Sequence, residues 1–178
     1  MSATLQGYLR ADGRKGIRNV LVVAYLVECA HHVAREIAAS FREQGVHLIG
    51  FPGCYPNAYA LGMMEKLATH PNVGGALLVS LGCEGFDKRR LARTIDASGR
   101  PVLTLGIQDA GGTKKTIAAG RAWVEATLPG SHAGAGKRCL NLVADGDQRR
   151  FGEFGEQACI GQARAAQQLE QLRVEVGA

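Results

Sequence analysis

Three cysteines in this chain come shortly after apolar runs that are typical of buried strands: Cys29, Cys54 and Cys83. If those runs form a parallel sheet, the three thiols lie at one edge of it, on loops that lead into helices. The N-terminus of a helix lowers the pKa of a thiol and favours anions. The set could hold a metal ion or an iron–sulfur cluster, or one thiol could act as a nucleophile. The alternative is that each cysteine is a small apolar residue at a crowded strand end.

Acidic and imidazole side chains stand beside these cysteines. Glu28 and Glu84 are direct neighbours of two of them, and a carboxylate there can act as a base or as a metal ligand. His31 and His32 begin the next predicted helix, where they are either ligands or proton donors, or polar residues of the helix surface. The cysteine spacings contain no C-x-x-C pair, which argues against a zinc knuckle.

A fourth apolar run is followed by a loop rich in glycine. The loop contains Gln108 and then Gly111, Gly112 and Thr113, directly before a predicted helix. Free backbone N–H groups in such a loop bind a carboxylate or a phosphate. The loop lacks the GxGxxG and GxxxxGK[ST] patterns, so the sequence gives only weak support to a nucleotide site.

A basic segment precedes the first of these runs. Arg10, Arg14, Lys15 and Arg18 fall within a short stretch that also holds the turn signal Asp12-Gly13. Guanidinium groups match carboxylates in a forked geometry, which favours an anion-binding loop. A solvated hairpin explains the same spacing equally well.

The elements that must position these residues alternate between strand and helix. Strands are predicted for residues 20–27, 46–51, 73–81 and 102–107. Helices are predicted from His31 to about Phe41, from Asn57, from Phe86 or Asp87, and for residues 114–127. Thr113 is the expected N-cap of the last helix, and Pro129-Gly130 its expected end. This alternation is typical of βαβ units with right-handed crossovers. We therefore predict an α/β fold, a three-layer αβα sandwich with a four- to five-stranded, mainly parallel sheet of flavodoxin- or Rossmann-like type.

The domain organisation follows from where this pattern ends. Residues 1–130 are predicted to form the α/β domain. Residues 131–178 are expected to add a flexible linker over 131–137, a possible fifth strand over 139–144 and a closing helix over 161–174, all of the same domain.

Composition narrows the class of protein. Hydrophobic residues make up 46% and charged residues 21% of 178, which indicates a globular domain with a real core. No apolar stretch approaches the roughly 20 residues of a membrane span, and no signal peptide is evident, so we expect a cytoplasmic protein with reduced thiols and no membrane partner. The net charge of +5 suits a small acidic ligand. The basic clusters 88–90 and 149–150 lack aromatic neighbours, which favours a solvated surface over nucleic-acid binding.

Five segments, in order, resemble the altronate and galactarate dehydratases, at the first α/β domain of their catalytic region. Residues 7–19 resemble GYxRxDGRxGxRN, residues 70–75 resemble HPNVGG, residues 81–84 resemble GLGCE, Gly53-Cys54 resembles a Gly-Cys element, and Gln108 with residues 111–113 resembles IQxxGGT. The large subunits of sulfolactate sulfo-lyases are similar too, so the resemblance leaves the eliminated group open.

The resemblance implies a lyase that removes water from an acidic hydroxy acid. In the family, a base takes the proton next to the carboxylate, a divalent metal (usually iron) steadies the enediolate, and the β-hydroxyl leaves as water. Carried over, Glu84 and Cys83 would be catalytic. The residues expected to bind substrate are Arg14, Arg18, Asn19, Gln108, Gly111, Gly112 and Thr113. Those expected to hold Fe2+ are Cys29, Cys54 and Cys83.

The resemblance stops after Gly130, before a large C-terminal region that family members carry, and a small N-terminal module of some members is also not found. We therefore expect a natural short relative, a subunit or a domain, acting with a C-terminal domain or a small partner subunit and assembling as a homo-oligomer. The alternative is a non-catalytic module of the same fold that binds an acidic metabolite or supports oligomerisation.

Overall fold

The computed structural model describes residues 2–132, 137–145 and 148–153. The chain divides into two compact units, residues 10–135 and residues 1–9 with 136–178. Each unit is described by itself. The predicted closing helix over 161–174 and part of the predicted linker lie outside the described residues.

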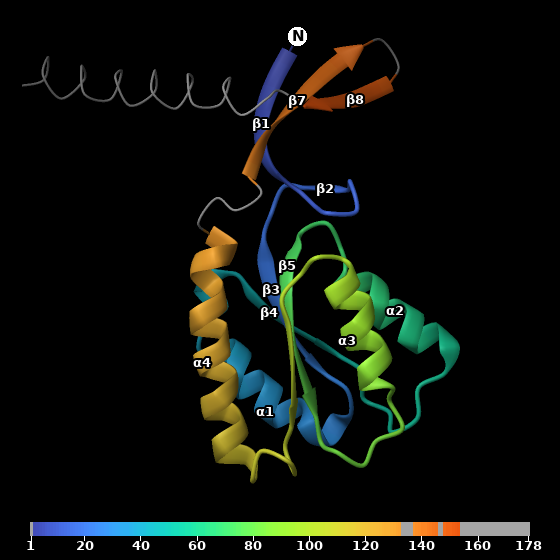
Figure 1. The fold of residues 1–178 in the computed structure, drawn as a ribbon, viewed down its shortest axis with the longest axis vertical. Coiled ribbons are helices and arrows are strands. Elements are labelled where there is room, and N and C mark those ends of the chain that lie inside the picture. Colours follow the sequence, from blue (N-terminus) through green and yellow to red (C-terminus); the bar gives the residue numbers. More distant parts are fainter. Residues whose placement is uncertain (1, 133–136, 146–147, 154–178) are drawn as a thin grey trace, which may run out of the picture. The chain divides into compact units, whose positions relative to one another are not determined.

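The larger unit is built on a parallel sheet of four strands (Figure 1). These are β3 (Val20–Tyr25), β4 (Val46–Gly50), β5 (Val73–Ser80) and β6 (Val102–Gly106), in the order β4-β3-β5-β6. All three pairings are parallel, so the carboxyl ends of the strands meet at one edge. The four strands predicted from apolar runs are thereby confirmed. The two-residue strand β2 (Lys15–Gly16) lies in the segment before β3.

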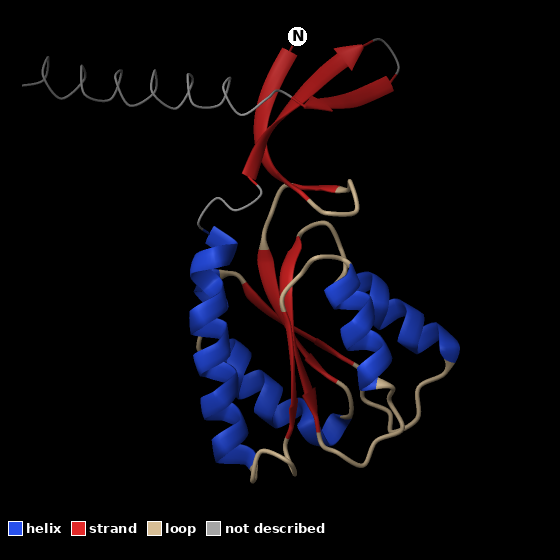
Figure 2. Ribbon diagram, viewed as in Figure 1, coloured by secondary structure: helices blue, strands red, loops and turns tan. Residues whose placement is uncertain are grey.

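Helices flank this sheet, as Figure 2 shows. They are α1 (Glu28–Ala39), α2 (Ala58–Ala68), α3 (Lys88–Ala97) and α4 (Thr113–His132), with the short 3-10 helix η1 (Arg42–Gln44) after α1. Side chains of α1 and α4 share one core with the sheet, and side chains of α2 and α3 share another. The fold is α/β with a parallel sheet, as the sequence predicts, while its assignment to a flavodoxin-like class stays a prediction.

The predicted helix boundaries hold at the starts of α2 and α3 and fail at both ends of α4. Asn57 caps α2 by accepting from the Ala60 N–H at 2.8 Å, and Asp87 caps α3 by accepting from the Arg90 N–H at 2.9 Å. Thr113 is the first residue of α4 and not its N-cap. The expected end at Pro129-Gly130 is wrong, because α4 continues to His132. The φ that proline fixes is compatible with helical backbone, although its missing N–H removes one hydrogen bond.

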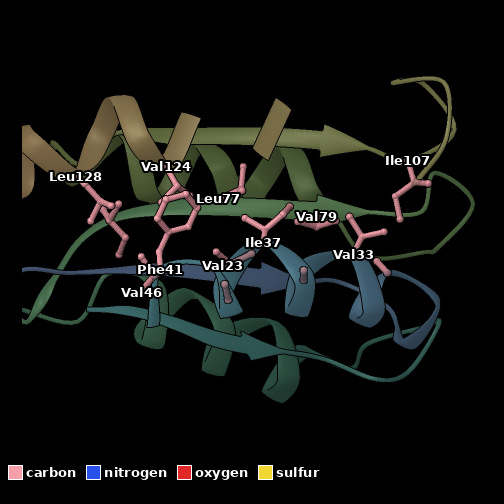
Figure 3. Close-up of a cluster of buried hydrophobic side chains, with 14 of the residues drawn as sticks. Val23, Val33, Ile37, Phe41, Val46, Leu77, Val79, Ile107, Val124 and Leu128 are labelled. Carbon is pink, nitrogen blue, oxygen red and sulfur yellow. The ribbon is translucent and has the colours of Figure 1, made fainter. Parts of the chain in front are cut away.

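Successive residues of the strands face opposite cores. On β5, Leu77 belongs to the cluster with α1 and α4, and Leu78 belongs to the cluster with α2 and α3. Both are 0% exposed, because the strand is covered on both faces. Figure 3 shows the first cluster, in which Ile37 of α1 and Val124 of α4 pack with Leu77 and Val23. The continuous apolar runs of the sequence reflect this double burial.

The smaller unit contains an antiparallel sheet. The strand β1 (Ser2–Leu9) pairs with β7 (Lys137–Asp145), which pairs in turn with β8 (Gln148–Glu153). The fifth strand expected over residues 139–144 exists, but it is not part of the parallel sheet. Its partner β1 was not predicted, since only scattered apolar residues mark that strand. Among the described residues, none of the helices combines the length and apolarity needed to cross a bilayer.

The central position of Leu77 yields a stability prediction. Replacing Leu77 with alanine should lower the free energy of unfolding by about 2–5 kcal/mol. The substitution would leave a cavity in the core, because Leu77 is fully buried on β5. Urea denaturation followed by circular dichroism measures this change. Ile17→Ala is the control, since Ile17 is 62% exposed and should change stability little. Equal losses for the two variants would contradict this placement of the core.

Candidate functional site

The loop after β5 holds Glu84 in a network of three hydrogen-bonding groups. The Ser80 hydroxyl donates to Glu84 Oε1, and the Gly82 backbone N–H donates to Glu84 Oε2 at 2.8 Å. Lys88 Nζ donates to Ser80 Oγ at 3.0 Å, so the hydroxyl accepts from the ammonium group while donating to the carboxylate. The carboxylate is therefore held in one orientation at the carboxyl end of the central strand.

This network sets the charge of Glu84. Partial burial raises the pKa of the carboxyl group, but the hydrogen bonds from Ser80 and Gly82 and the nearby Lys88 charge lower it, and the net pKa lies below the usual value. Glu84 is thus ionised at neutral pH. An ionised carboxylate can accept a proton or bind a cation, although a lowered pKa makes it a weaker base.

Sequence reasoning missed two members of this network, Ser80 and Lys88. Ser80 is 0% exposed and is the last residue of an otherwise apolar strand, so its hydroxyl needs a buried partner. That polar residue at the end of an apolar run was the signal in the sequence. Lys88 gave no such signal, because it reads as part of a basic surface cluster.

Gln108 lies beside the loop that carries Glu84. The resemblance assigns both residues to one site. Gly82 has a φ of +125°, and a Cβ there would come within 2.6 Å of Gln108 Oε1. The Gln108 N–H donates to the Leu81 carbonyl at 3.2 Å. The side-chain amide of Gln108 therefore covers the backbone immediately before Cys83.

Cys54 belongs to a neighbouring loop at the same edge. The Gly85 N–H donates to the Cys54 carbonyl at 2.9 Å, and a Cβ on Gly85 would meet the Tyr55 ring at 2.5 Å. The structure thus brings the loops of Cys54, Glu84 and Gln108 together.

The three cysteines of the predicted site are exposed. Cys29, Cys54 and Cys83 are all free thiols at the surface, so the alternative that they are small buried residues is wrong. Cys29 lies in the first turn of α1, and that turn is joined to the Cys54 loop because the Glu28 N–H donates to the Pro52 carbonyl at 3.1 Å.

The side chains beside Cys29 make contacts of their own. Glu28 Oε1 lies 3.1 Å from His31 Nδ1, and the His31 ring packs on Tyr25 with centroids 4.8 Å apart. Within the part of the chain that the structure describes, no group of three or more His, Cys, Asp or Glu side chains is placed to hold a metal ion. The donors present therefore do not fit a metal by themselves.

Backbone N–H groups of the glycine loop donate to carbonyls just before them in the chain. Gly111 and Gly112 adopt φ values of +82° and +102°, which a residue with a side chain rarely does. The Gly112 N–H donates to the Ile107 carbonyl at 2.9 Å, and the Gly111 N–H donates to the Gln108 carbonyl at 3.3 Å. The expectation of free N–H groups is wrong at these two positions. Thr113 follows as the exposed first residue of α4.

The predicted substrate-binding residues Arg14, Arg18 and Asn19 lie at the other end of the sheet. Their segment precedes β3, and its N–H groups at Ile17 and Arg18 donate to Asn72 Oδ1, before β5, at 2.9 and 3.2 Å. The eight residues of β5 separate the two edges by roughly 25 Å. A sugar acid at Glu84 therefore does not reach these side chains of the same chain. The sequence carried this signal, because residues before a parallel strand lie at its amino end.

Arg10 ties this segment to the turn before β5. Its guanidinium donates to the Pro71 carbonyl at 2.6 Å, to Asn19 Oδ1 at 2.7 Å and to the Arg18 carbonyl at 3.1 Å. A Cβ on Gly16 would lie 2.2 Å from the Pro71 carbonyl oxygen. Residues 10–19 and residues 70–75, which belong to two of the segments that carry the resemblance, thus pack against each other.

Asp12 and two arginines complete this amino-edge network. Arg14 bonds Asp12 at 2.7 Å and the Thr69 carbonyl at 2.6 Å, while Arg100, 3% exposed, lies 3.7 Å from Asp12. The hydrogen bond from Arg14 outweighs the desolvation of Asp12 and lowers its pKa to about 2. These contacts give the segment a structural role that needs no ligand.

The fold and the site define an α/β domain with a fixed, ionised carboxylate at the ligand edge of a parallel sheet. The chain belongs to the D-galactarate dehydratase/altronate hydrolase family, whose second-domain model matches residues 7–131. The sequence predicts the first α/β domain of the catalytic region, whereas the matching model describes a second domain. The finer placement within the catalytic region therefore stays a prediction.

Two curated relatives agree with this family. The chain is 30% identical to altronate dehydratase of Escherichia coli (strain K12) over 93 residues, which cover 45% of this chain and 19% of that protein. It is 24% identical to altronate dehydratase of Bacillus subtilis (strain 168) over 105 residues, which cover 52% and 21%. The chain thus spans about a fifth of the length of these relatives. No solved structure matches it significantly.

The depressed pKa of Asp12 predicts an acid-dependent loss of stability. The carboxylate stabilises the fold fully above its ordinary pKa of 3.8, and that contribution is lost as pH falls toward about 2. Asp12→Asn should therefore unfold more easily at pH 6 and lose less stability than wild type between pH 4 and 2. Urea titrations at each pH measure this, with the exposed Asp96→Asn as control. Parallel pH profiles for wild type and Asp12→Asn would contradict the network.

The Ser80 hydroxyl should set the titration of Glu84. Ser80→Ala removes a hydrogen bond to the charged form, so the pKa of Glu84 should rise toward its ordinary value. Carboxyl 13C NMR of glutamate-labelled protein follows this titration directly. Ser98→Ala, at the end of α3, is the matched control and should leave Glu84 unchanged. An unaltered Glu84 titration in Ser80→Ala would refute the assignment.

Proposed function

We propose that this chain provides the Glu84 side of the active site of a sugar-acid dehydratase, a hydro-lyase that acts on altronate, galactarate or a similar hydroxy acid. The observation that supports this most is the oriented, ionised Glu84 between the loops of Cys54 and Gln108. Membership in the dehydratase family supplies the reaction class.

The proposed chemistry is an elimination. Glu84 accepts the proton from the carbon next to the substrate carboxylate, the electron pair of that C–H bond forms the C=C bond, and the hydroxyl on the next carbon leaves as water once protonated. The enol product then rearranges to a 2-keto-3-deoxy acid. Cys83 borders the reacting carbons, and the Gln108 amide with the loop at Gly111, Gly112 and Thr113 binds substrate oxygens.

The metal proposed from the resemblance, most simply Fe2+, needs donors beyond the described residues. Cys29, Cys54 and Cys83 can each offer an exposed thiolate, but they form no three-donor group with their neighbours in the described part of the chain. We therefore route no step through the metal. If one is bound, it would stabilise the developing enediolate charge.

Several broader features remain part of the proposal. Catalysis requires a further domain or partner subunit, because the chain spans about a fifth of its curated relatives. We propose a cytoplasmic homo-oligomer, and a sulfolactate-type elimination remains an alternative for the leaving group. The strand order β4-β3-β5-β6 supports a flavodoxin-like arrangement. Arg14, Arg18 and Asn19 would contact substrate only if another chain brought a second site to the amino edge.

A second candidate function is a non-catalytic module that binds an acidic metabolite or supports oligomerisation. The lowered pKa of Glu84 favours it, because a weaker base is less suited to remove a proton from carbon. Such a module would bind altronate without converting it.

The test is dehydration by a chimaera in which residues 7–131 replace the matched segment of the E. coli altronate dehydratase. Anaerobically prepared chimaera should convert altronate or galactarate to the 2-keto-3-deoxy acid, measured as its semicarbazone, and its metal content is measured in parallel. Glu84→Gln should lower kcat at least 100-fold, because the amide cannot accept the proton. The control is Glu43→Gln in η1, away from the ligand edge.

Two results would count against the catalytic role. Full activity of the Glu84→Gln chimaera removes the proposed base. A folded chimaera that binds altronate without product, whatever metal is supplied, supports the non-catalytic module.

A further inference from the structure

One face of α2 carries a row of exposed apolar side chains. Tyr55, just before the helix, is 83% exposed, Tyr59 75%, Met63 39% and Leu67 42%. Residues four apart lie above one another on a helix, so the three helical members form a single row that points back to Tyr55. Side chains of this size rarely stand exposed together on a surface that has no partner.

The row is not the core face of α2. Met64 is 3% exposed and Ala68 is 0% exposed, and both pack into the cluster shared with α3 and the sheet. The helix is therefore apolar on two sides, one of them already buried. A surface helix with one packed side normally has a polar opposite side. The second apolar side of α2 thus indicates a contact outside the described residues.

The row begins at the candidate site. Tyr55 directly follows Cys54, and its ring lies over the backbone of Gly85, next to Glu84. Midway along the row, a Cβ on Gly62 would meet no atom within 4 Å, so a partner backbone can approach closely there. A domain seated on this row would stand beside the carboxyl edge of the sheet.

Exposed cations lie on α2 itself and on the neighbouring helix α3. Lys66 of α2 is exposed next to Leu67, and α3, which packs against α2, exposes Arg89, Arg90 and Arg93. Glu65 pairs with Arg90 at 2.9 Å on the side of α2 that faces α3, so Lys66 is the cation nearest the row and the α3 arginines lie across the helix from it. Together these cations form the basic border of the α2–α3 surface. An antiparallel second copy would bring two such basic borders toward each other, which disfavours self-association. A partner with carboxylates around an apolar strip complements this surface.

We infer that the row Tyr55–Tyr59–Met63–Leu67 is the docking surface for a second dehydratase-family domain, one with an acid-rimmed apolar strip. This inference rests on the proposed function, since that domain is the one expected to complete the site at Glu84. The length of the relatives supports this occupant, because most of each altronate dehydratase lies outside the region that this chain matches.

The area of the row limits the affinity that it can provide by itself. The two exposed tyrosines dominate it, and an aromatic side chain buries about 150–250 Å². The row alone is smaller than the roughly 800 Å² per partner of a standard stable interface. It therefore forms the apolar centre of a contact whose rim is the basic border, and the complex should weaken as salt is raised.

The experiment measures binding of this chain to the E. coli altronate dehydratase from which the matched segment has been deleted. Biolayer interferometry should show saturable binding that weakens with added NaCl. The double variant Tyr59→Glu/Met63→Glu should weaken binding at least tenfold, because it places two carboxylates in the apolar strip and opposite an acidic rim. Ala119→Glu, on the exposed side of α4, is the matched control and should bind like wild type.

A second measurement covers the case in which the deletion variant does not fold. In the chimaera of residues 7–131 described above, oxidation of Tyr55 and Tyr59 by hydroxyl radicals should fall at least threefold relative to the free chain. Mass spectrometry of the peptides reads this out, with Trp123 of α4 as internal reference. Unprotected tyrosines in a folded chimaera overturn the inference.

The remaining outcomes are decisive. The inference is overturned if Tyr59→Glu/Met63→Glu binds as tightly as wild type, or if a folded deletion variant does not bind this chain. It is also overturned if this chain forms dimers that depend on Tyr59. Protected tyrosines in a chimaera that is inactive, or equally active with Glu84→Gln, support docking and defeat only the proposed function. The two proposals can thus fail separately.

Discussion

The parallel pairing of β5 with β3 on one side and β6 on the other is the constraint on which the structure depends. It places the strand inside the sheet, where helices cover both faces and Leu77 and Leu78 lie in separate cores. It also fixes what lies at each end. The Asn72 turn leads into the strand, and Ser80 leads out of it to Glu84. The residues at the amino end of β5 therefore stabilise the fold, while those at its carboxyl end form the candidate site.

The two ends use charge in different ways. At the amino edge, Arg10 donates to two backbone carbonyls and to Asn19 Oδ1, Arg100 donates to backbone carbonyls, and Asp12 pairs with Arg14. Those cations hold two loops together. At the carboxyl edge, Lys88 reaches Glu84 only through the Ser80 hydroxyl, which leaves the carboxylate oriented and partly open. The motif residues of this family thus divide into a structural group and a group suited to bind a ligand.

Much of the fold was predictable from local pattern. Runs buried on both faces read as parallel strands, and Asn57 and Asp87 mark helix starts because their side chains cap the first turn. The strand β1 was missed because its pairing with β7 joins segments more than a hundred residues apart. The end of α4 was misplaced because a proline costs a helix one hydrogen bond without forbidding its backbone.

The sequence by itself determined the α/β fold, the edge at which Cys54, Cys83 and Glu84 gather, and the resemblance to the dehydratases. Apolar periodicity and motif order are properties of the sequence, so they can be recognised without a structure. Only the tertiary structure decided that the Arg10 guanidinium joins the segment before β3 to the turn before β5, and that Ser80 links Lys88 to Glu84. Those facts depend on which side chains meet in space, which composition and spacing do not encode.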